Sequence, residues 1–169
     1  TVSLRELDML MSCGEIISGV VLTTTLQNKG YEATFLTGAQ AGIITNEEFG
    51  NASILRVETE NLKEYLKDNQ VVIVAGFQGV TEKGEITTLG RGGSDTSATA
   101  LGAALNADLI EIYTDVDGIK TADPKIVDNA KTLETVTYGE ICQLAYQGAK
   151  VVHPRAVEIA MKHNIPIRV

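Results

Sequence analysis

The segment Gly90–Asp95, with the sequence GRGGSD, has the residue types of an anion-binding loop. Its glycines let backbone N–H groups approach a ligand closely, and the N-terminus of a helix predicted from Ser97 adds partial positive charge. Arg91 can hold a carboxylate or a phosphate through two hydrogen bonds, and Asp95 can pair with an ammonium group. The alternative is a tight strand-to-helix turn capped by Ser94 or Asp95. The arginine between glycines favours the binding loop.

A second polar segment, Tyr113–Gly118, follows a predicted strand and leads to Ala122–Pro124. Ligands of open α/β sheets bind just beyond the carboxyl ends of the strands. The aspartates here can hold ribose hydroxyls, magnesium or only nearby backbone groups. Asp-Gly and Asp-Pro pairs are also ordinary turn formers, so both interpretations stay open. The spacing is not that of an EF-hand calcium loop.

Lys150 and His153 lie in a short connection between two predicted helices, where Lys150 can reach a phosphate. His153 is either a base or a packed residue that hydrogen-bonds a neighbouring loop, and we favour the packed residue. The other histidine, His163, is expected to be a cation at a helix C-terminus.

Gly14 and Glu15 interrupt the first helical pattern. A glycine there costs about 1 kcal/mol relative to alanine and commonly marks a close approach of backbone or ligand. Glu15 is either a buried carboxylate that needs a cationic partner or part of a solvated face. The sequence contains no Gly-x-Ser-x-Gly, His-Glu-x-x-His or Walker pattern, so it gives no support to nucleophilic or metalloprotease chemistry.

The elements that must position these residues alternate along the chain, which predicts an α/β fold with a mainly parallel sheet. Capping boxes at Ser3/Glu6 and Thr137/Glu140 predict two helix starts. The continuously apolar Val71–Ala75 predicts a strand buried on both faces, and Lys83-Gly84 predicts a hairpin turn. Predicted helices cover 4–29, 60–67, 97–106, 141–147 and 154–162, and predicted strands cover 32–36, 52–57, 71–75, 77–80, 86–89, 109–114 and 165–169, with a polar stretch at 37–48.

Length and composition limit the function further. The chain has 169 residues, enough for one domain, and its net charge of −8 and scarce aromatic residues argue against nucleic-acid binding. Cys13 and Cys142 form no metal-binding pattern, and we expect both to be buried thiols in a reducing compartment. No continuous apolar run approaches the roughly 18 residues of a membrane span and no signal peptide is visible, so a cytoplasmic protein without membrane contact is expected.

Six stretches together resemble the catalytic domain of the aspartokinases, within the amino acid kinase family. The run Thr87–Asp95 is specific to aspartokinases in that family, and the resemblance covers essentially the whole chain. The matching stretches are Thr37–Gly42, Val74–Val80, Thr87–Asp95, Tyr113–Gly118, Thr121–Pro124 and Gly148–Arg155.

The resemblance implies a three-layer αβα sandwich and ATP-dependent phosphorylation of the side-chain carboxylate of L-aspartate, the first step toward lysine, threonine and methionine. ATP would carry Mg²⁺, no metal would be held by the protein itself, and a homo-oligomer is expected. The implied substrate residues are Glu15, Arg91, Gly92, Gly93, Ser94 and Asp95; the implied nucleotide residues are Thr114, Asp115, Lys120, Lys125, Lys150 and Val151; Asp95 and Lys150 would be catalytic.

The chain also departs from the family pattern. The family commonly has an aromatic residue at the position of Lys120 and arginine at that of Lys125. The resemblance further implies that residues 1–169 form a single, partial catalytic domain, without the N-terminal Lys-Phe-Gly-Gly strand and without regulatory ACT domains. One alternative is a fragment that binds or assembles without turnover, and the expected missing strand supports it. The other is another amino acid kinase, such as a glutamate or uridylate kinase, and the Arg91–Asp95 loop argues against it.

Overall fold

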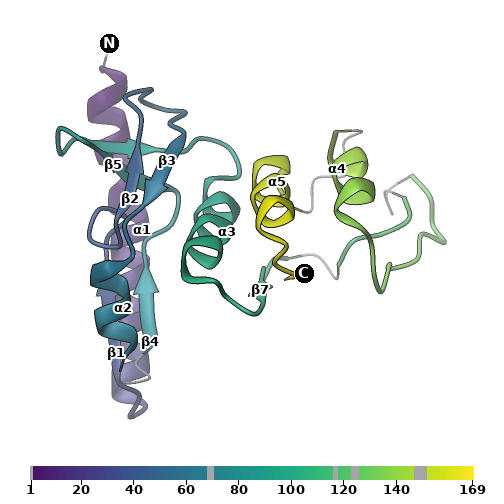
Figure 1. The fold of residues 1–169 in the computed structure, drawn as a ribbon, viewed down its shortest axis with the longest axis horizontal. Helices are drawn as coiled ribbons and strands as arrows, with labels where there is room; N and C mark the ends of the chain where they lie inside the picture. Colours follow the sequence, from purple (N-terminus) through teal and green to yellow (C-terminus); the bar gives the residue numbers. More distant parts are fainter. Residues whose placement is uncertain (1, 68–70, 116–117, 123–125, 147–151) are drawn as a thin grey trace.

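The computed structural model describes residues 2–67, 71–115, 118–122, 126–146 and 152–169. Helices and strands alternate as predicted (Figure 1). The helices are α1 (Leu4–Asn28), α2 (Glu60–Leu66), α3 (Gly93–Leu105), α4 (Tyr138–Tyr146) and α5 (Pro154–His163). The strands are β1 (Ala33–Leu36), β2 (Ile43–Thr45), β3 (Ile54–Val57), β4 (Val71–Val74), β5 (Gln78–Thr81), β6 (Ile86–Thr88), β7 (Ile110–Glu111) and β8 (Ile167–Arg168).

The described strands form two parallel pairs and one mixed sheet. Strand β1 runs parallel to β4, with Ala33 opposite Val71, and β7 runs parallel to β8. The mixed sheet has the order β3-β2-β5-β6, in which β2 and β5 are parallel and the two outer pairings are antiparallel. The predicted hairpin is confirmed as β5–β6, with Gly84 at φ +83° in its turn.

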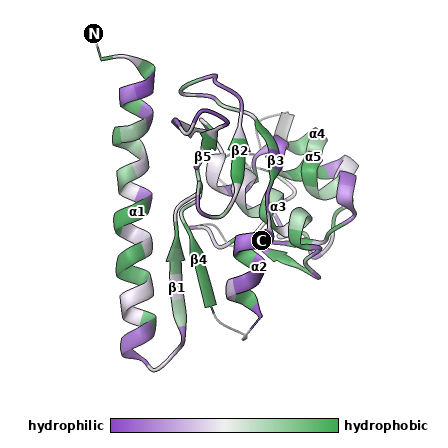
Figure 2. Ribbon diagram, turned by 60° about the vertical axis from the view of Figure 1, so that its left-hand side comes forward, coloured by the Kyte–Doolittle hydropathy of each residue, from purple (hydrophilic) through white to green (hydrophobic). Residues whose placement is uncertain are grey.

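The layers are arranged around these strands. Figure 2 shows α1 on one side of β1 and β4 and α2 on the other. Leu62 of α2 packs with Leu36 and Val74 on that second side, where α3 also contributes Leu101 and Leu105. Beyond α3, helices α5 and α4 follow in turn, and Ile141, Ala156 and Val157 form their shared core. Helices thus cover both faces of the β1–β4 pair, as in an αβα sandwich.

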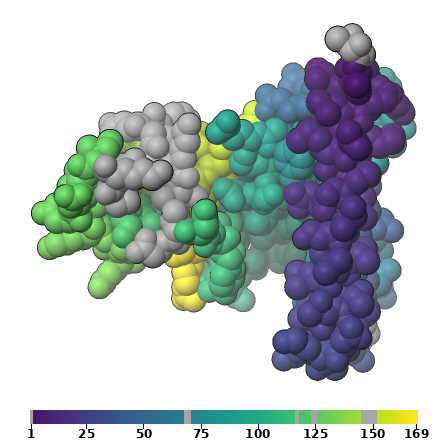
Figure 3. Space-filling view, turned by 180° about the vertical axis from the view of Figure 1, so that it is seen from behind, coloured from purple at the N-terminus to yellow at the C-terminus, as the bar shows by residue number. Residues whose placement is uncertain are grey.

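Helix α1 has an inverted polarity. Its buried residues are Asp8, Ser12, Gly19 and Thr23, which are all polar or small. Gly19 lies under Phe35, because a Cβ there would be 2.3 Å from the phenylalanine ring. The opposite face is apolar and exposed, and α1 lies on the surface along its whole length in Figure 3. Its exposed large apolar side chains are Leu4, Leu7, Met9, Leu10, Met11, Ile17, Val20, Val21 and Leu22.

The same composition makes α1 long and apolar enough to cross a membrane, with a mean hydropathy of 1.5 in its most apolar window. The prediction that no segment approaches a membrane span was therefore too narrow, since it considered only unbroken apolar runs. One such helix is weak evidence for a span, because helices of folded domains pass the same test. Here Asp8 and Ser12 of the helix are hydrogen-bonded to strands of the domain, so we treat α1 as part of the domain.

Several local predictions were wrong. Strand β2 lies within the stretch predicted to be polar. Strand β4 is not buried on both faces: Val71 is 42% exposed, and of the described strands only β1 pairs with it. Cys13 is exposed because it lies away from the buried face of α1, and Cys142 is half-buried. The predicted strand 109–114 is reduced to Ile110–Glu111.

Candidate active site

The glycine-rich loop connects β6 directly to α3. Gly90 and Gly92 have φ values of +71° and +70°, a left-handed conformation that glycine adopts at little cost. Gly92 is the N-cap of α3, so the helix begins four residues earlier than predicted, and Ser94 and Asp95 lie in its first turn rather than at its cap. Arg91 is exposed between the two glycines. The guanidinium and the helix N-terminus are therefore both available on this loop.

Two aromatic rings hold the loop. A Cβ on Gly92 would lie 2.2 Å from Cγ of His153, and a Cβ on Gly93 would lie 2.7 Å from the Phe77 ring. Phe77 itself has φ +64°, a conformation that bulky residues rarely adopt. Its backbone N–H donates to Ser97 Oγ at 2.9 Å, and its carbonyl accepts from Leu89 N at 2.9 Å. Strained backbone of this kind clusters at functional sites.

The N-terminus of α5 docks on the same loop. The His153 backbone N–H donates to Asp95 Oδ2 at 3.2 Å, and Arg155 Nη1 donates to the Leu89 carbonyl at 3.3 Å. His153 Nδ1 accepts from the Arg155 N–H at 3.3 Å and so caps α5. The prediction of a packed His153 that hydrogen-bonds a neighbouring loop is confirmed. One oxygen of Asp95 is thus engaged in joining the loop to α5. The other predicted histidine, His163, is the last residue of α5, as expected.

A cavity of about 510 Å³ opens beside the loop, between α1, α2, β4 and α3. Glu15, Gly76 and Ser94 line it together with Ser97, and its remaining lining is apolar. Glu15 is half-buried, so the structure brings two predicted substrate residues, from α1 and α3, to one cavity. Of the two close approaches that the sequence suggested at Gly14, that of another backbone segment is wrong, because a Cβ there would meet no described protein atom within 4 Å.

A second cavity, of about 600 Å³, lies between α4, α5, β8 and residues 132–138. It is larger than the first, but among the predicted site residues that the structure describes, none line it. We therefore place the candidate site at the first cavity and the adjoining loop.

The predicted nucleotide residues are only partly described. Thr114 and Asp115 follow the carboxyl end of β7, are exposed, and share a hydrogen bond of 3.3 Å between Thr114 Oγ1 and Asp115 Oδ1. Lys120 is half-buried and forms an isolated antiparallel bridge with Thr132. The predictions for Lys125, Lys150 and Val151 fall outside the described residues.

Sequence reasoning missed three residues that hold the site. Phe77 and Arg155 contact the loop from other elements, and nothing in the sequence marks those contacts. Asp8 is fully buried, with both oxygens hydrogen-bonded. Its signal was available, since a carboxylate in an apolar helical run has the same cost of burial that drew attention to Glu15.

The resolved pKa shifts in the C-terminal part of the chain have local causes. Hydrogen bonds from the Thr137 N–H and hydroxyl lower the pKa of Glu140 and confirm the predicted capping box. Burial, together with the charge of Glu158, raises the pKa of the Cys142 thiol.

Comparison with known proteins agrees with this geometry. The sequence model of the amino acid kinase family matches residues 1–169. Aspartokinase 1 of Bacillus subtilis is 60% identical over 168 residues, which are 99% of this chain and 42% of that protein. The chain thus spans about two fifths of the length of this relative.

Solved structures show the same likeness. The E. coli aspartokinase III structure in complex with aspartate and ADP (R-state) matches with a TM-score of 0.86 at 35% identity, over 99% of this chain and 38% of that one. Aspartate kinase from Synechocystis matches with a TM-score of 0.83 at 50% identity, over 99% of this chain and 27% of that one. These matches confirm the predicted αβα fold class. The αβα fold, the glycine-rich loop and the match of the family model to residues 1–169 together show that this chain belongs to the amino acid kinase family, with aspartokinases among its relatives.

Proposed function

We propose that the chain supplies the substrate-binding part of an ATP-dependent aspartate kinase, which phosphorylates the side-chain carboxylate of L-aspartate to 4-phospho-L-aspartate. The names of its relatives and the aspartate and ADP in the E. coli structure support this activity. We further propose that the enzyme is cytoplasmic and catalyses the first step toward lysine, threonine and methionine.

The observation that carries the proposal is the juxtaposition of Arg91's loop with the Glu15 cavity, because Ser94 belongs to both. Aspartate offers two carboxylates and one ammonium group. Arg91 would bind a carboxylate, with Gly92, Gly93 and Ser94 lining the pocket. Glu15 and Asp95 would face the ammonium group. Arg91 would thus pair with one substrate carboxylate and the protein carboxylates with the ammonium group, which leaves the second substrate carboxylate in need of a further cation.

The chemistry needs little from the protein beyond position and charge. The reacting carboxylate is already ionised at neutral pH, since the ordinary pKa of aspartate is about 3.9, so no general base is required. The difficulty is the approach of this anion to the γ-phosphate, and cations relieve it. One unit cation at 4 Å is worth about 4 kcal/mol at an effective dielectric of 20, before desolvation. Lys150 would be that cation, and it lies three residues before His153 in the sequence.

ATP would bring Mg²⁺ as its own counter-ion. Thr114 and Asp115 would contact the nucleotide, at the position beyond the end of β7 where α/β folds bind ligands. The remaining nucleotide contacts would come from Lys120, Lys125 and Val151. Asp95 would act with Lys150 at the point of transfer. Through its bond to the His153 N–H, Asp95 links the substrate loop to the N-terminus of α5.

A homo-oligomer is also part of the proposal. Leu10, Ile17 and Val21 of α1 are 68%, 65% and 61% exposed, and α1 has no charged residue after Glu15. A helix of 25 residues is roughly 37 Å long, which is enough for a standard interface. An uncharged apolar face matches an identical face, and we propose that a second copy covers it.

The experiment that tests the activity is the formation of acyl phosphate from L-aspartate and ATP, trapped with hydroxylamine. It should be run on this chain and on the full-length protein that contains it, with L-glutamate as the alternative carboxylate acceptor and with ADP release measured separately for uridine monophosphate, which forms no acyl phosphate. Aspartate hydroxamate from the full-length protein supports the proposal, and its absence overturns it. If only the full-length protein is active, turnover requires a part of the enzyme outside residues 1–169. We also propose that residues 1–169 form a single, partial catalytic domain. The same comparison tests this, because a complete catalytic domain would be active by itself.

A further inference from the structure

The Asp8 carboxylate is fully buried in the first half of α1 and accepts three hydrogen bonds. Its Oδ2 accepts from the backbone N–H groups of Gly50 and Thr88 at 2.8 and 2.9 Å. Its Oδ1 accepts from the Thr88 hydroxyl at 2.7 Å. The carboxylate therefore joins three segments that are far apart in the sequence: α1, the loop after β2, and the end of β6.

Neutral hydrogen-bond donors, rather than a cation, stabilise the buried carboxylate of Asp8. Of the residues that the structure describes, none forms an ion pair with Asp8, and Arg5, one turn earlier, is paired with Glu6 and Glu85 instead. A buried carboxylate without a cationic partner is costly to desolvate, and its three hydrogen bonds offset that cost. An apolar residue at this position would leave the Gly50 and Thr88 N–H groups without this acceptor, so the arrangement of the three segments depends on the carboxylate.

Asp8 fixes the position of the chain segment that leads to Arg91. Thr88 is the last residue of β6, and its carbonyl accepts from Ala52 N at 2.9 Å. Gly90 then turns against the same loop, because a Cβ on it would lie 2.8 Å from Asn51 Oδ1 and 3.1 Å from the Gly50 carbonyl. Asp8 thus fixes both the strand that precedes Arg91 and the surface against which the chain turns.

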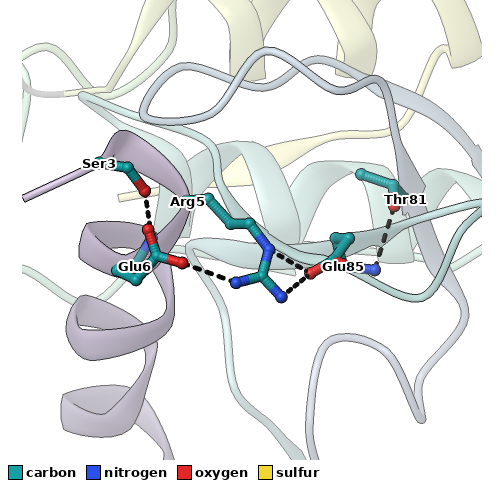
Figure 4. Close-up of polar contacts among 5 residues, drawn as sticks. All are labelled: Ser3, Arg5, Glu6, Thr81 and Glu85. Carbon is teal, nitrogen blue, oxygen red and sulfur yellow. Dashed lines mark hydrogen bonds and ion pairs between the residues drawn. The ribbon is translucent and has the colours of Figure 1, made fainter.

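We call the hydrogen bonds from Gly50 and Thr88 to Asp8 the clamp. Helix α1 carries both Asp8 and Glu15, a proposed substrate residue. Glu15 lies seven residues after Asp8, two turns and about 10 Å along the same face. At the other end of β6, Arg5 bonds Glu85, as Figure 4 shows, and the Thr81 hydroxyl accepts from the Glu85 N–H. The helix therefore holds β6 at both ends, but only the Asp8 contact lies next to the loop of Arg91.

We propose that Asp8 is a positioning residue that sets Arg91 relative to Glu15, so that one zwitterionic substrate meets both groups at once. The identity of that substrate as aspartate rests on the function proposed above. The clamp itself is a property of this chain. Asp8 does not touch the substrate, and it acts through the backbone of Thr88 and Gly50.

The first test is Asp8→Asn in the full-length protein. It replaces the charged acceptor with a neutral amide oxygen, which weakens the hydrogen bonds from the Gly50 and Thr88 N–H groups. We expect the KM for aspartate to rise about tenfold or more, while the KM for ATP stays within about twofold. The matched control is Glu85→Gln, which loosens the other end of β6 and should leave both KM values near those of the wild type. Equal changes in both KM values, or no change in a folded Asp8→Asn protein, would overturn the proposal.

Thr88 supplies a milder pair of variants should Asp8→Asn not fold. Thr88→Val removes the hydroxyl that Asp8 Oδ1 accepts from, whereas Thr88→Ser keeps it. We expect Thr88→Val to raise the KM for aspartate and Thr88→Ser to restore it. If the two variants behave alike, the hydroxyl contact does not position the loop.

Amide hydrogen exchange separates the clamp from the proposed activity. In Asp8→Asn, or in Thr88→Val, the amides of Gly50 and Thr88, which donate to Asp8, and of Gly93, which donates to the Gly90 carbonyl, should exchange faster than in the wild type or in Glu85→Gln. If the protein has no activity on aspartate, the proposed function fails, and exchange at these amides still decides whether the clamp exists. Unchanged exchange there would overturn the clamp whatever the substrate is.

Discussion

The His153 imidazole lies directly on the backbone of Gly92, so closely that a Cβ on Gly92 would come within 2.2 Å of the ring. This contact, with the bond from the His153 N–H to Asp95, seats α5 on the candidate substrate loop. Because Gly92 also has a positive φ, two independent constraints exclude a side chain there.

Gly92→Ala should therefore destabilise the protein by at least about 2 kcal/mol, combining left-handed strain with the displaced ring. Gly14→Ala is the matched control. It lies within α1, where a Cβ meets nothing within 4 Å, and should stabilise by about 0.5–1 kcal/mol. Urea denaturation of the two variants measures both effects. A Gly92→Ala protein no less stable than Gly14→Ala would contradict both the ring contact and the left-handed strain at Gly92.

Arg91→Ala should weaken aspartate binding by about 1.5–3 kcal/mol, the loss of a charged hydrogen-bond partner. The corresponding rise in the KM for aspartate is about 10-fold to 150-fold. Arg56→Ala removes another arginine, whose partners Glu58 and Glu82 lie on the surface, and should change little. An unchanged KM for aspartate in Arg91→Ala would remove Arg91 from the site.

Lys150→Ala should reduce kcat more than it changes the KM for aspartate, because a cation at the phosphates acts mainly on the transferring group. Steady-state kinetics with each substrate varied in turn measures the split. Lys162→Ala, in the last turn of α5, controls for loss of one positive charge. An effect confined to aspartate affinity would contradict the phosphate role.

The Glu140 capping box predicts a pH dependence of stability. Its pKa is lower in the folded protein than the ordinary value of 4.5, because the Thr137 N–H and hydroxyl favour the ionised form. The stabilisation is therefore present above pH 4.5 and is lost as pH falls through the lower, folded pKa.

Denaturation of wild type and Glu140→Gln at several pH values, with an NMR titration of the Glu140 carboxyl, measures this effect. The two proteins should differ in stability near neutral pH and converge in acid. Glu60→Gln is the comparison, because the N-cap of its helix, Thr59, makes no side-chain capping bond. A difference that persists unchanged into acid would contradict the assignment.

Ile17→Lys should shift the protein toward the monomer, since it places a charge in the apolar face proposed to contact a second copy. Sedimentation velocity measures the distribution, and circular dichroism checks that α1 remains helical. Leu55→Lys on β3 is the control, because Leu55 is also exposed, at 58%, but lies on a different element. A monomeric wild type, or equal effects of both variants, would rule out this interface.

Local rules in the sequence predicted much of this fold. Ser3 caps α1 and Thr137 precedes α4 with reciprocal bonds to Glu140, because capping depends on residues only three positions apart. The β5–β6 hairpin was predicted for the same reason. Strand β2 was missed because three residues are too few to show a pattern and its burial comes from strands on either side.

Some residues of the candidate site could be predicted from the sequence and others could not. The glycine-rich loop and Glu15 stand out by residue type alone. The start of α3 at Gly93 and the roles of Phe77 and Asp8 depend on partners tens of residues away, such as Ser97 and Thr88, and no spacing rule specifies them. The sequence pattern predicted the helix over 4–29, but no pattern shows that the polar face of α1 is the one that packs inward.

The reversed polarity of α1 sets two different mutational tolerances on one helix. Positions such as Ser12 and Gly19 are limited by volume, because strand residues lie against them, and larger apolar substitutions should be rejected there. At exposed positions such as Leu10 and Val21, polar substitutions should be rejected only if another protein surface covers the position. A saturation library of α1, selected for folding and separately for activity, would therefore map which outer positions are covered in the working protein, without a structure of any complex.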